Sequence, residues 1–223
     1  MTNTAAELLA SKPNVLLDFD GPVCSVFGGV GADTVARQLR ERLGLSEQHS
    51  ADVRDPFEIL WYAAAEGRRE AIEAERELTK LEVEAVASAT LTPGVAGLLT
   101  TLADRKQVVV IVSNNSVAAI HTYLDSRGLA PLVRGVSARI DPDPMLLKPS
   151  PHLLNHAIEH LNATHGECVV IGDSAADIQA ARAAGTPVIG FSNKPGKRER
   201  LASHQPDSII DDIAQLLNTV RDQ

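Results

Sequence analysis

The chain has 223 residues, of which 44% are hydrophobic, and its mean hydropathy of −0.04 excludes both a disordered chain and a membrane-resident one. No apolar run approaches the length of a transmembrane helix, and residues 1–13 lack the basic start and apolar core of a signal peptide. The formal net charge of −8 argues against a nucleic-acid surface, which needs a clustered basic face, so we expect a cytoplasmic protein that binds neither nucleic acid nor membrane.

The first predicted element is an apolar strand at residues 15–17 that ends abruptly in Asp18 and Asp20, followed by Gly21. A short apolar run before a turn is typical of a buried parallel strand, and open α/β sheets bind ligands beyond the carboxyl ends of such strands. In an extended chain the side chains of Asp18 and Asp20 point to one side. Two neighbouring carboxylates repel each other unless a cation lies between them, which indicates a divalent metal ion. A purely structural acidic turn is the alternative interpretation.

A helical segment follows this strand. The glycine-rich stretch at residues 27–31 is flexible in character, and no strand-like run occurs from there to residue 88. Helices are predicted at residues 33–43, 56–66 and 69–88, the last of which is rich in strong helix formers with opposite charges at helical spacing.

The remainder of the chain alternates between strands and helices. Strands are predicted at residues 108–112, 132–136, 168–171 and 188–191. Helices are predicted at residues 95–105, 116–127, 152–161, 177–184 and 209–220. This alternation predicts right-handed βαβ crossovers and a parallel sheet covered on both faces. The predicted fold is therefore α/β, a Rossmann-like doubly wound parallel core of residues 1–22 and 91–223 with an inserted α-helical cap of residues 23–90.

Three further polar clusters lie where a predicted strand ends or a predicted helix begins. Ser113 and Asn114 follow the five β-branched residues of the strand at 108–112. Lys148 precedes a proline-framed helix start, and Asp173 and Asp177 follow the strand at 168–171. Together with the first strand, these clusters offer acids, a hydroxyl group and an ammonium group at one predicted edge of the sheet.

The four clusters, in this order, resemble the motifs of haloacid dehalogenase superfamily hydrolases with a helical cap, such as phosphoglycolate phosphatase and β-phosphoglucomutase-like proteins. The matching segments are Asp18-Phe19-Asp20-Gly21, Ser113-Asn114, Lys148-Pro149 and Gly172-Asp173-Ser174-Ala175-Ala176-Asp177. They span nearly the whole chain. The resemblance implies a phosphoric monoester hydrolase that acts on a small phosphorylated metabolite.

The resemblance also implies the roles of the acids. Asp18 is the expected nucleophile, which forms an aspartyl-phosphate, and Asp20 is the expected acid and base. The implied cofactor is Mg²⁺, bound by Asp18, the backbone carbonyl of Asp20 and Asp173. Asp177 is expected to orient either a metal-bound water or Lys148.

The phosphoryl group is expected to bind Ser113, the backbone amide of Asn114, and Lys148, which is also expected to keep Asp18 ionised. Ser113 and Asn114 also suit a helix N-cap, and Asp177 suits a helix start. Pro22 follows Gly21 where a hydroxyl residue is frequent in the family, which mildly disfavours a mutase. Two alternatives to a phosphatase remain: a β-phosphoglucomutase-like phosphotransferase and a non-catalytic binding or regulatory module.

Substrate specificity is expected from the cap, whereas the sequence predicts neither the substrate's identity nor the oligomeric state. Trp61 and Tyr62 are expected to fill the small core of the cap rather than flank a substrate. The dense basic run at residues 194–200 is expected on a solvated helix. The candidate specificity residues, chosen because they are aromatic or cationic, are Phe27, Arg37, Arg54, Trp61, Tyr62 and Arg68.

Overall fold

The computed structural model describes residues 4–45 and 53–217, and its centre is one sheet of six parallel strands. The strand order is β5-β4-β1-β6-β7-β8, so the chain builds outward from β1 in one direction and then, from β6, in the other. This confirms the predicted α/β class. The strands are β1 (Asn14–Leu17), β4 (Val108–Ser116), β5 (Gly135–Arg139), β6 (Cys168–Gly172), β7 (Val188–Phe191) and β8 (Ser208–Ile210).

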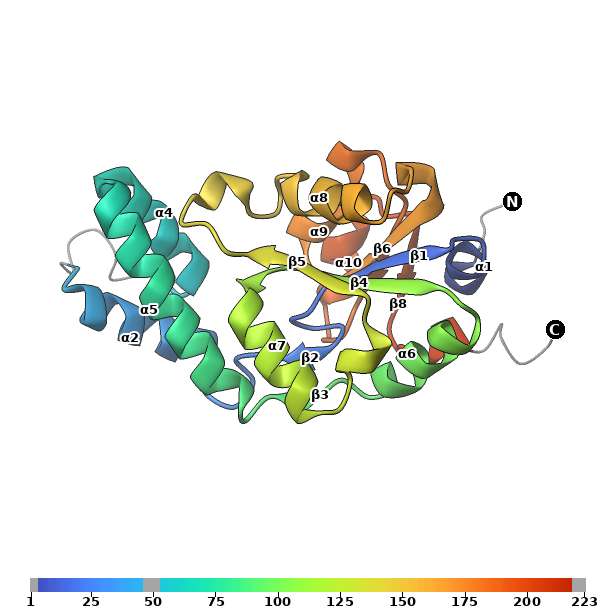
Figure 1. Ribbon diagram of the computed structural model, residues 1–223, viewed down its shortest axis with the longest axis horizontal. Helices are drawn as coiled ribbons and strands as arrows, with labels where there is room; N and C mark the ends of the chain where they lie inside the picture. The colour runs from blue at the N-terminus through green and yellow to red at the C-terminus, as the bar shows by residue number, and fades with distance from the viewer. Residues whose placement is uncertain (1–3, 46–52, 218–223) are drawn as a thin grey trace.

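Helices cover both faces of the sheet (Figure 1) because successive residues of its buried strands point to opposite sides. In β1, Val15 and Leu17 join the core beneath α6 (Val95–Asp104) and α7 (Val117–Ser126). Leu16 joins the opposite core, which α8 (His152–His160) and α9 (Ala175–Ala184) cover. Three short helices complete the described core: α1 (Ala5–Ala10), α10 (Lys197–Ala202) and α11 (Ala214–Leu217).

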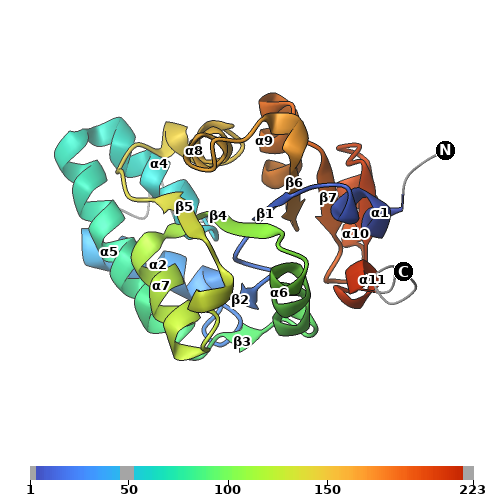
Figure 2. The same ribbon diagram turned by 45° about the vertical axis from the view of Figure 1, so that its right-hand side comes forward.

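The helical insertion lies on the side of the sheet where the strands end, at the left of Figure 1. It contains α2 (Ala32–Leu43), α4 (Pro56–Glu66) and α5 (Arg68–Val86), which pack on one another (Figure 2). Two short antiparallel strands, β2 (Cys24–Ser25) and β3 (Thr90–Leu91), pair where the chain enters and leaves the insertion. The insertion therefore has one two-stranded connection to the sheet, whereas its definition as a separate domain of residues 23–90 stays a prediction.

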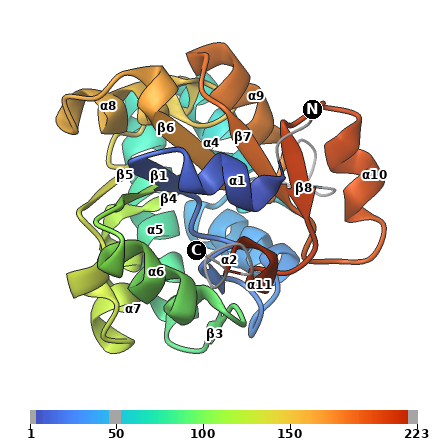
Figure 3. The ribbon, with the colours of Figure 1, turned by 90° about the vertical axis from the view of Figure 1, so that its right-hand side faces the viewer.

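Two predicted elements are wrong in position or type. The strand expected at residues 132–136 begins at Gly135, and the residues before it form a 3₁₀ helix at Ala130–Leu132. The helix expected at residues 209–220 starts instead as β8, because Ile209 and Ile210 pair in parallel with β7. Only α11 is helical within the described part of this segment, and residues 218–220 lie outside it. Figure 3 shows β8 beside β7 and α11 close to α1.

Within the described ranges, 4–45 and 53–217, no helix combines the length and the apolar character needed to cross a membrane.

Candidate active site

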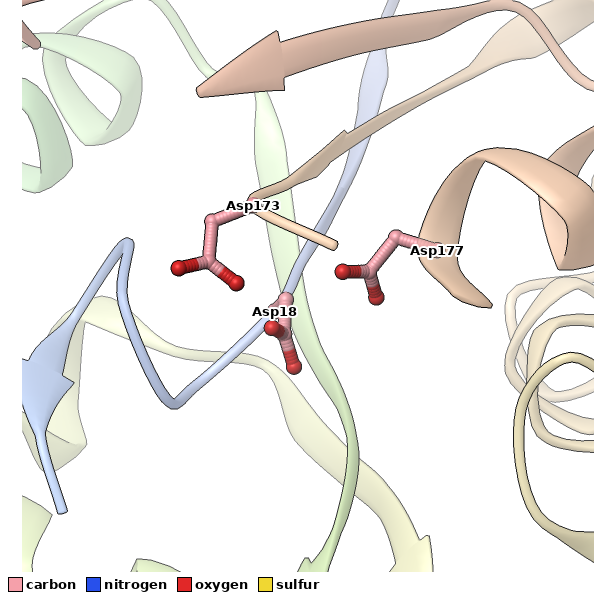
Figure 4. A group of neighbouring side chains, drawn as sticks. All are labelled: Asp18, Asp173 and Asp177. Carbon is pink, nitrogen blue, oxygen red and sulfur yellow. The ribbon is translucent and has the colours of Figure 1, made fainter. Parts of the chain in front are cut away.

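Three carboxylates meet at the carboxyl ends of β1 and β6 (Figure 4). Asp18, Asp173 and Asp177 each offer one oxygen atom, and these oxygens lie within 4.8 Å of one another. The strand order reverses at β1, and such a switch point is where open α/β sheets bind ligands. The structure therefore brings these three acids together at the carboxyl-terminal edge of the sheet.

Sheet pairing explains why the acids meet. Leu17 pairs with Ile171, and the backbone N–H of Asp18 donates to the carbonyl of Ile171 at 2.9 Å. Asp18 and Asp173 therefore follow the ends of two adjacent strands at almost the same position along the sheet. Gly21 turns away with a φ of +106°, and a Cβ atom there would lie 2.3 Å from Oδ2 of Asp173. Only glycine allows the loop after β1 to approach Asp173 this closely.

Lys148 is the cation at the centre of this cluster. Its ammonium group donates to Oδ1 of Asp18 at 2.8 Å, to Oδ1 of Asp177 at 2.5 Å and to the carbonyl of Val112 at 3.0 Å. All three donors of the ammonium are thus used, although the residue is only 8% exposed. The side chain of Asn114 fixes the backbone of Lys148, donating to its carbonyl at 3.0 Å and accepting from its N–H at 2.8 Å.

Asp177 makes one of the two contacts predicted for it, the contact with Lys148. Its other oxygen accepts hydrogen bonds from the backbone N–H and the hydroxyl of Ser174. The backbone N–H of Asp177 in turn donates to the hydroxyl of Ser174, which completes the capping box that starts α9. The structural interpretation of Asp177 as a helix-start residue therefore also holds.

Ser113 lies within β4, towards its carboxyl end, and is buried. Its hydroxyl donates to Oδ1 of Asn115 at 3.2 Å and accepts from the backbone N–H of Asn115 at the same distance. The N-cap of α7 is Ser116, not Ser113 or Asn114, because the hydroxyl of Ser116 accepts from the N–H of Ala119. The alternative that Ser113 or Asn114 caps this helix is therefore wrong.

Asp20 lies at the edge of the cluster, where its Oδ1 accepts the backbone N–H of Val26 at 2.9 Å. Burial raises the pKa of Asp20 to about 6, against the opposing effects of that hydrogen bond and of Lys194 and Lys197. A carboxyl group with this pKa exchanges protons close to neutral pH, as a general acid or base must.

Burial is also the first cause of the raised pKa values of Asp18 and Asp173. At Asp18 the charge of Asp177 adds to this rise, and Lys148 opposes it without overcoming it. Burial disfavours the charged form of Lys148 as well, but Asp177 and Asp18 outweigh that effect and hold its pKa above the ordinary value. The cluster thus carries more negative charge than its lysines balance, which is the environment of a cation site.

Two residues from the loop after β7 and from α10 reach Asp173, and the sequence did not single them out for this role. Asn193 donates to Oδ2 of Asp173 at 3.0 Å, and Lys197 forms an ion pair with the same oxygen. The basic run was visible in the sequence, but its expected position on a solvated helix is wrong for Lys197. Asp173 also lines a cavity of about 510 Å³ together with Lys194, Lys197 and Arg200.

A second set of polar residues that the sequence did not indicate lies behind Ser113 and Asn114. Glu82 of α5 and Arg139 of β5 are fully or almost fully buried and form an ion pair. Glu82 is one of many glutamates on its helix, so no local signal marks it.

The predicted specificity residues of the cap do not form one group. Phe27 is buried in the main apolar core, and Arg37 pairs with Glu41 on the surface of α2. The expected core packing of Trp61 and Tyr62 is wrong, because their residues are 46% and 43% exposed. The buried face of α4 is formed instead by Ile59, Leu60 and Ala63. Arg54 and Arg68 are exposed, and a role in specificity stays a prediction for the exposed residues.

The fold and the site together define a capped hydrolase-type fold. It combines a doubly wound α/β sheet, acidic strand ends around a buried lysine, and a helical insertion after the first strand. A sequence model of the haloacid dehalogenase-like hydrolase family matches residues 14–185, and the chain belongs to this family. The resemblance inferred from the four motifs is thereby confirmed.

Relatives with assigned names match parts of the chain. Pyrophosphatase PpaX of Listeria welshimeri is 38% identical over 76 residues, which are 34% of this chain and 35% of that protein. Phosphoglycolate phosphatase of Yersinia pseudotuberculosis is 29% identical over 130 residues, which are 58% of this chain and 55% of that protein. The chain thus covers between a third and just over half of the length of these relatives.

Solved structures share the fold over almost the whole chain. A predicted phosphoglycolate phosphatase from Haemophilus somnus has a TM-score of 0.69 at 21% identity and covers 95% of this chain and 99% of that chain. CbbY from Rhodobacter sphaeroides, solved in complex with phosphate, has a TM-score of 0.70 at 19% identity and covers 92% of this chain and 96% of that chain. At these identities the likeness concerns the fold alone.

Proposed function

We propose that the protein is a Mg²⁺-dependent phosphatase that hydrolyses the phosphate monoester of a small metabolite through an aspartyl-phosphate on Asp18. The observation that carries this proposal is the contact of Lys148 with Asp18 and Asp177, next to the carboxylate of Asp173. A nucleophilic carboxylate, a fixed cation and a second acidic strand end are the groups that phosphoryl transfer needs.

The residues present fit a magnesium ion. Asp18 and Asp173 supply hard oxygen ligands, which Mg²⁺ prefers. Burial raises the pKa of both acids because it disfavours their charged forms, and a bound cation would offset this effect. The backbone carbonyl of Asp20 is the proposed third protein ligand. When bound, the ion would neutralise charge on the phosphoryl oxygens.

The chemistry falls to Asp18 and Asp20. An oxygen of Asp18 attacks phosphorus, the bond from phosphorus to the leaving oxygen breaks, and Asp20 donates its proton to that oxygen. A water molecule then attacks the phosphorus of the aspartyl-phosphate, Asp20 takes the proton of this water, and Asp18 is released with inorganic phosphate. The pKa of about 6 for Asp20 suits both proton transfers.

Ser113, the amide of Asn114 and Lys148 bind the phosphoryl oxygens in this proposal. Lys148 would act on the phosphoryl oxygens as a fixed positive charge, because its three N–H donors are already held by Asp18, Asp177 and the carbonyl of Val112. The names of the relatives support a small phosphorylated substrate. They include a pyrophosphatase and a phosphoglycolate phosphatase, and a CbbY structure holds xylulose-(1,5)bisphosphate.

The proposal is tested with p-nitrophenyl phosphate and a panel of metabolite phosphates. Turnover should require Mg²⁺ and vanish in Asp18→Asn, whereas Asp20→Ala should lose more activity on alkyl than on activated aryl phosphates, because only poor leaving groups need a proton. Equal losses on both substrate types would contradict the role of Asp20. An isomeric sugar phosphate in place of free phosphate would indicate the phosphotransferase alternative, and no turnover on the whole panel would favour a non-catalytic module.

A further inference from the structure

A buried polar network joins the inserted helix α5 to the end of β4. We call it the Glu82 network, and it consists of Glu82, Asn115, Ser116 and Arg139. Each of the four residues is at most 2% exposed. They come from α5, from the end of β4 and from the last position of β5, so three separate elements meet at one carboxylate.

The carboxylate of Glu82 accepts three hydrogen bonds. Oε1 accepts from the side-chain amide of Asn115 at 3.1 Å, and Oε2 accepts from the backbone N–H of Ser116 at 2.9 Å and from Arg139 at 2.5 Å. Removing one partner of a buried ion pair leaves the other charge buried and unpaired, which strongly lowers the stability of the protein. The arrangement therefore depends on the exact chemistry of Glu82.

This network reaches the proposed phosphoryl-binding residues from both sides. Asn115, held by Glu82, contacts the hydroxyl of Ser113 through its side chain and through its backbone N–H, both at 3.2 Å. Arg139 donates from Nε to the carbonyl of Asn114 at 3.0 Å. Ser113 and Asn114 thus have their positions fixed by residues that lie behind them.

We propose that Glu82 and Arg139 are positioning residues that hold the Ser113 hydroxyl and the Asn114 amide in the geometry that binds a phosphoryl group. This inference rests on the proposed function, because it assigns phosphate binding to Ser113 and Asn114. It also makes the inserted helix part of the machinery that binds phosphate, apart from any contact of the cap with the substrate. Donors whose heavy atoms are already held in place bind phosphate at a smaller reorganisation cost, here the rotation of the Ser113 O–H away from Oδ1 of Asn115. Misplacement of Ser113 and Asn114 should therefore weaken binding more than the chemical step.

Glu75 provides a matched control. It lies two turns before Glu82 on α5, and its Oε1 accepts from Arg139 at 2.8 Å. Its side chain is 20% exposed, whereas that of Glu82 is fully buried. Glu75 therefore shares the helix, the charge and the arginine partner of Glu82, but it has no contact with Asn115 or Ser116 among those described.

The first variant is Glu82→Gln, which keeps the shape but replaces one acceptor oxygen with a donor amide. One of the three donors around Glu82 then faces another donor, so the end of β4 at Asn115 and Ser116 loses part of its support. We expect the KM for p-nitrophenyl phosphate and the dissociation constant for inorganic phosphate, measured by calorimetry, to rise together by about tenfold, with kcat changing less. Glu75→Gln should change either constant less than about twofold.

A second variant, Glu82→Gln with Arg139→Met, separates positioning from stability and carries the test if the single variant fails to fold. Removing both buried charges is often tolerated, so the melting temperature should recover relative to Glu82→Gln. The KM and the phosphate dissociation constant should stay raised, because Asn114 has lost its contact with Arg139.

Recovery of wild-type phosphate binding together with stability would overturn the proposal, as would an unchanged phosphate affinity in Glu82→Gln. Wild-type protein that binds phosphate but never hydrolyses an ester would contradict the proposed function alone. Wild-type protein that binds no phosphate would overturn both.

Discussion

Replacing Asp20 with asparagine should stabilise the metal-free protein at alkaline pH and much less at acidic pH. Burial raises the pKa of Asp20 from the model-peptide value of 3.8 to about 6, so the folded state holds this proton more tightly than the unfolded chain does. The sign follows from linkage. Below pH 3.8 Asp20 is protonated in both states and does not change the free energy of unfolding. As the pH rises, ionisation of Asp20 lowers this free energy, and the full loss applies above pH 6.

The size of the effect follows from the shift. Each pKa unit corresponds to about 1.36 kcal/mol, so a shift of roughly two units lowers the free energy of unfolding by about 3 kcal/mol at about pH 8. At about pH 4.5 the loss is only about 1 kcal/mol. Asparagine is neutral in both states and can still accept the N–H of Val26, so the variant avoids this cost. For a chain of this length the melting temperature should rise by about 6–12 °C at the higher pH.

The assay is thermal unfolding with chelator present, at both pH values. Asp125→Asn serves as the matched control, because it removes one negative charge from an exposed position and should change the melting temperature little at either pH. An equal stabilisation by Asp20→Asn at both pH values, or none at the higher one, would show that ionisation of Asp20 is not the cause and would refute the reasoning.

Three further outcomes are expected. Lys197→Met should tighten Mn²⁺ binding by about tenfold in calorimetry, because the ion no longer displaces an ammonium from Asp173. The control Arg198→Met removes an exposed ion pair and should change Mn²⁺ affinity less than about twofold. Asp177→Asn should lower the free energy of unfolding by about 2 kcal/mol in urea titrations, because Lys148 loses a buried charged partner; an unchanged midpoint would contradict this. Leu99→Ala, in the fully buried core under β1, should cost about 2–5 kcal/mol in the same titration without changing the KM, and a raised KM would show that the core and the site are coupled.

Hydrophobic runs predicted most of the strands because a parallel sheet buries both faces of each strand. β5 shows where this signal fails. The strand was predicted at residues 132–136 from their apolar side chains, but it continues through Ser137 and Arg139. These two residues can be buried because their side chains hydrogen-bond to Leu153 and Glu82. These partners are distant in sequence, so local hydrophobicity could not reveal that polar residues belong to the strand.

The same distinction applies to the site. Residues directly after strands, such as Asp18 and Asp173, could be predicted because parallel strands end at one edge of the sheet. Glu82, Asn193 and Lys197 could not, because two helices and a loop bring them to the site through tertiary packing. Their residue types are ordinary for exposed positions, and only the contacts give them a role.

The two lysines of the site differ in a way that bears on metal exchange. Lys148 has a side chain that is 5% exposed and uses all three donors, so its charge is a permanent part of the site. Lys197 extends from the six-residue helix α10 with a side chain that is 18% exposed, and it borders the cavity beside Asp173. An ammonium at this position can leave Asp173 for solvent at a cost of about 1 kcal/mol, since its charge becomes hydrated as it moves. Lys197 therefore suits a replaceable counter-charge, which would balance Asp173 until the proposed metal ion takes its place.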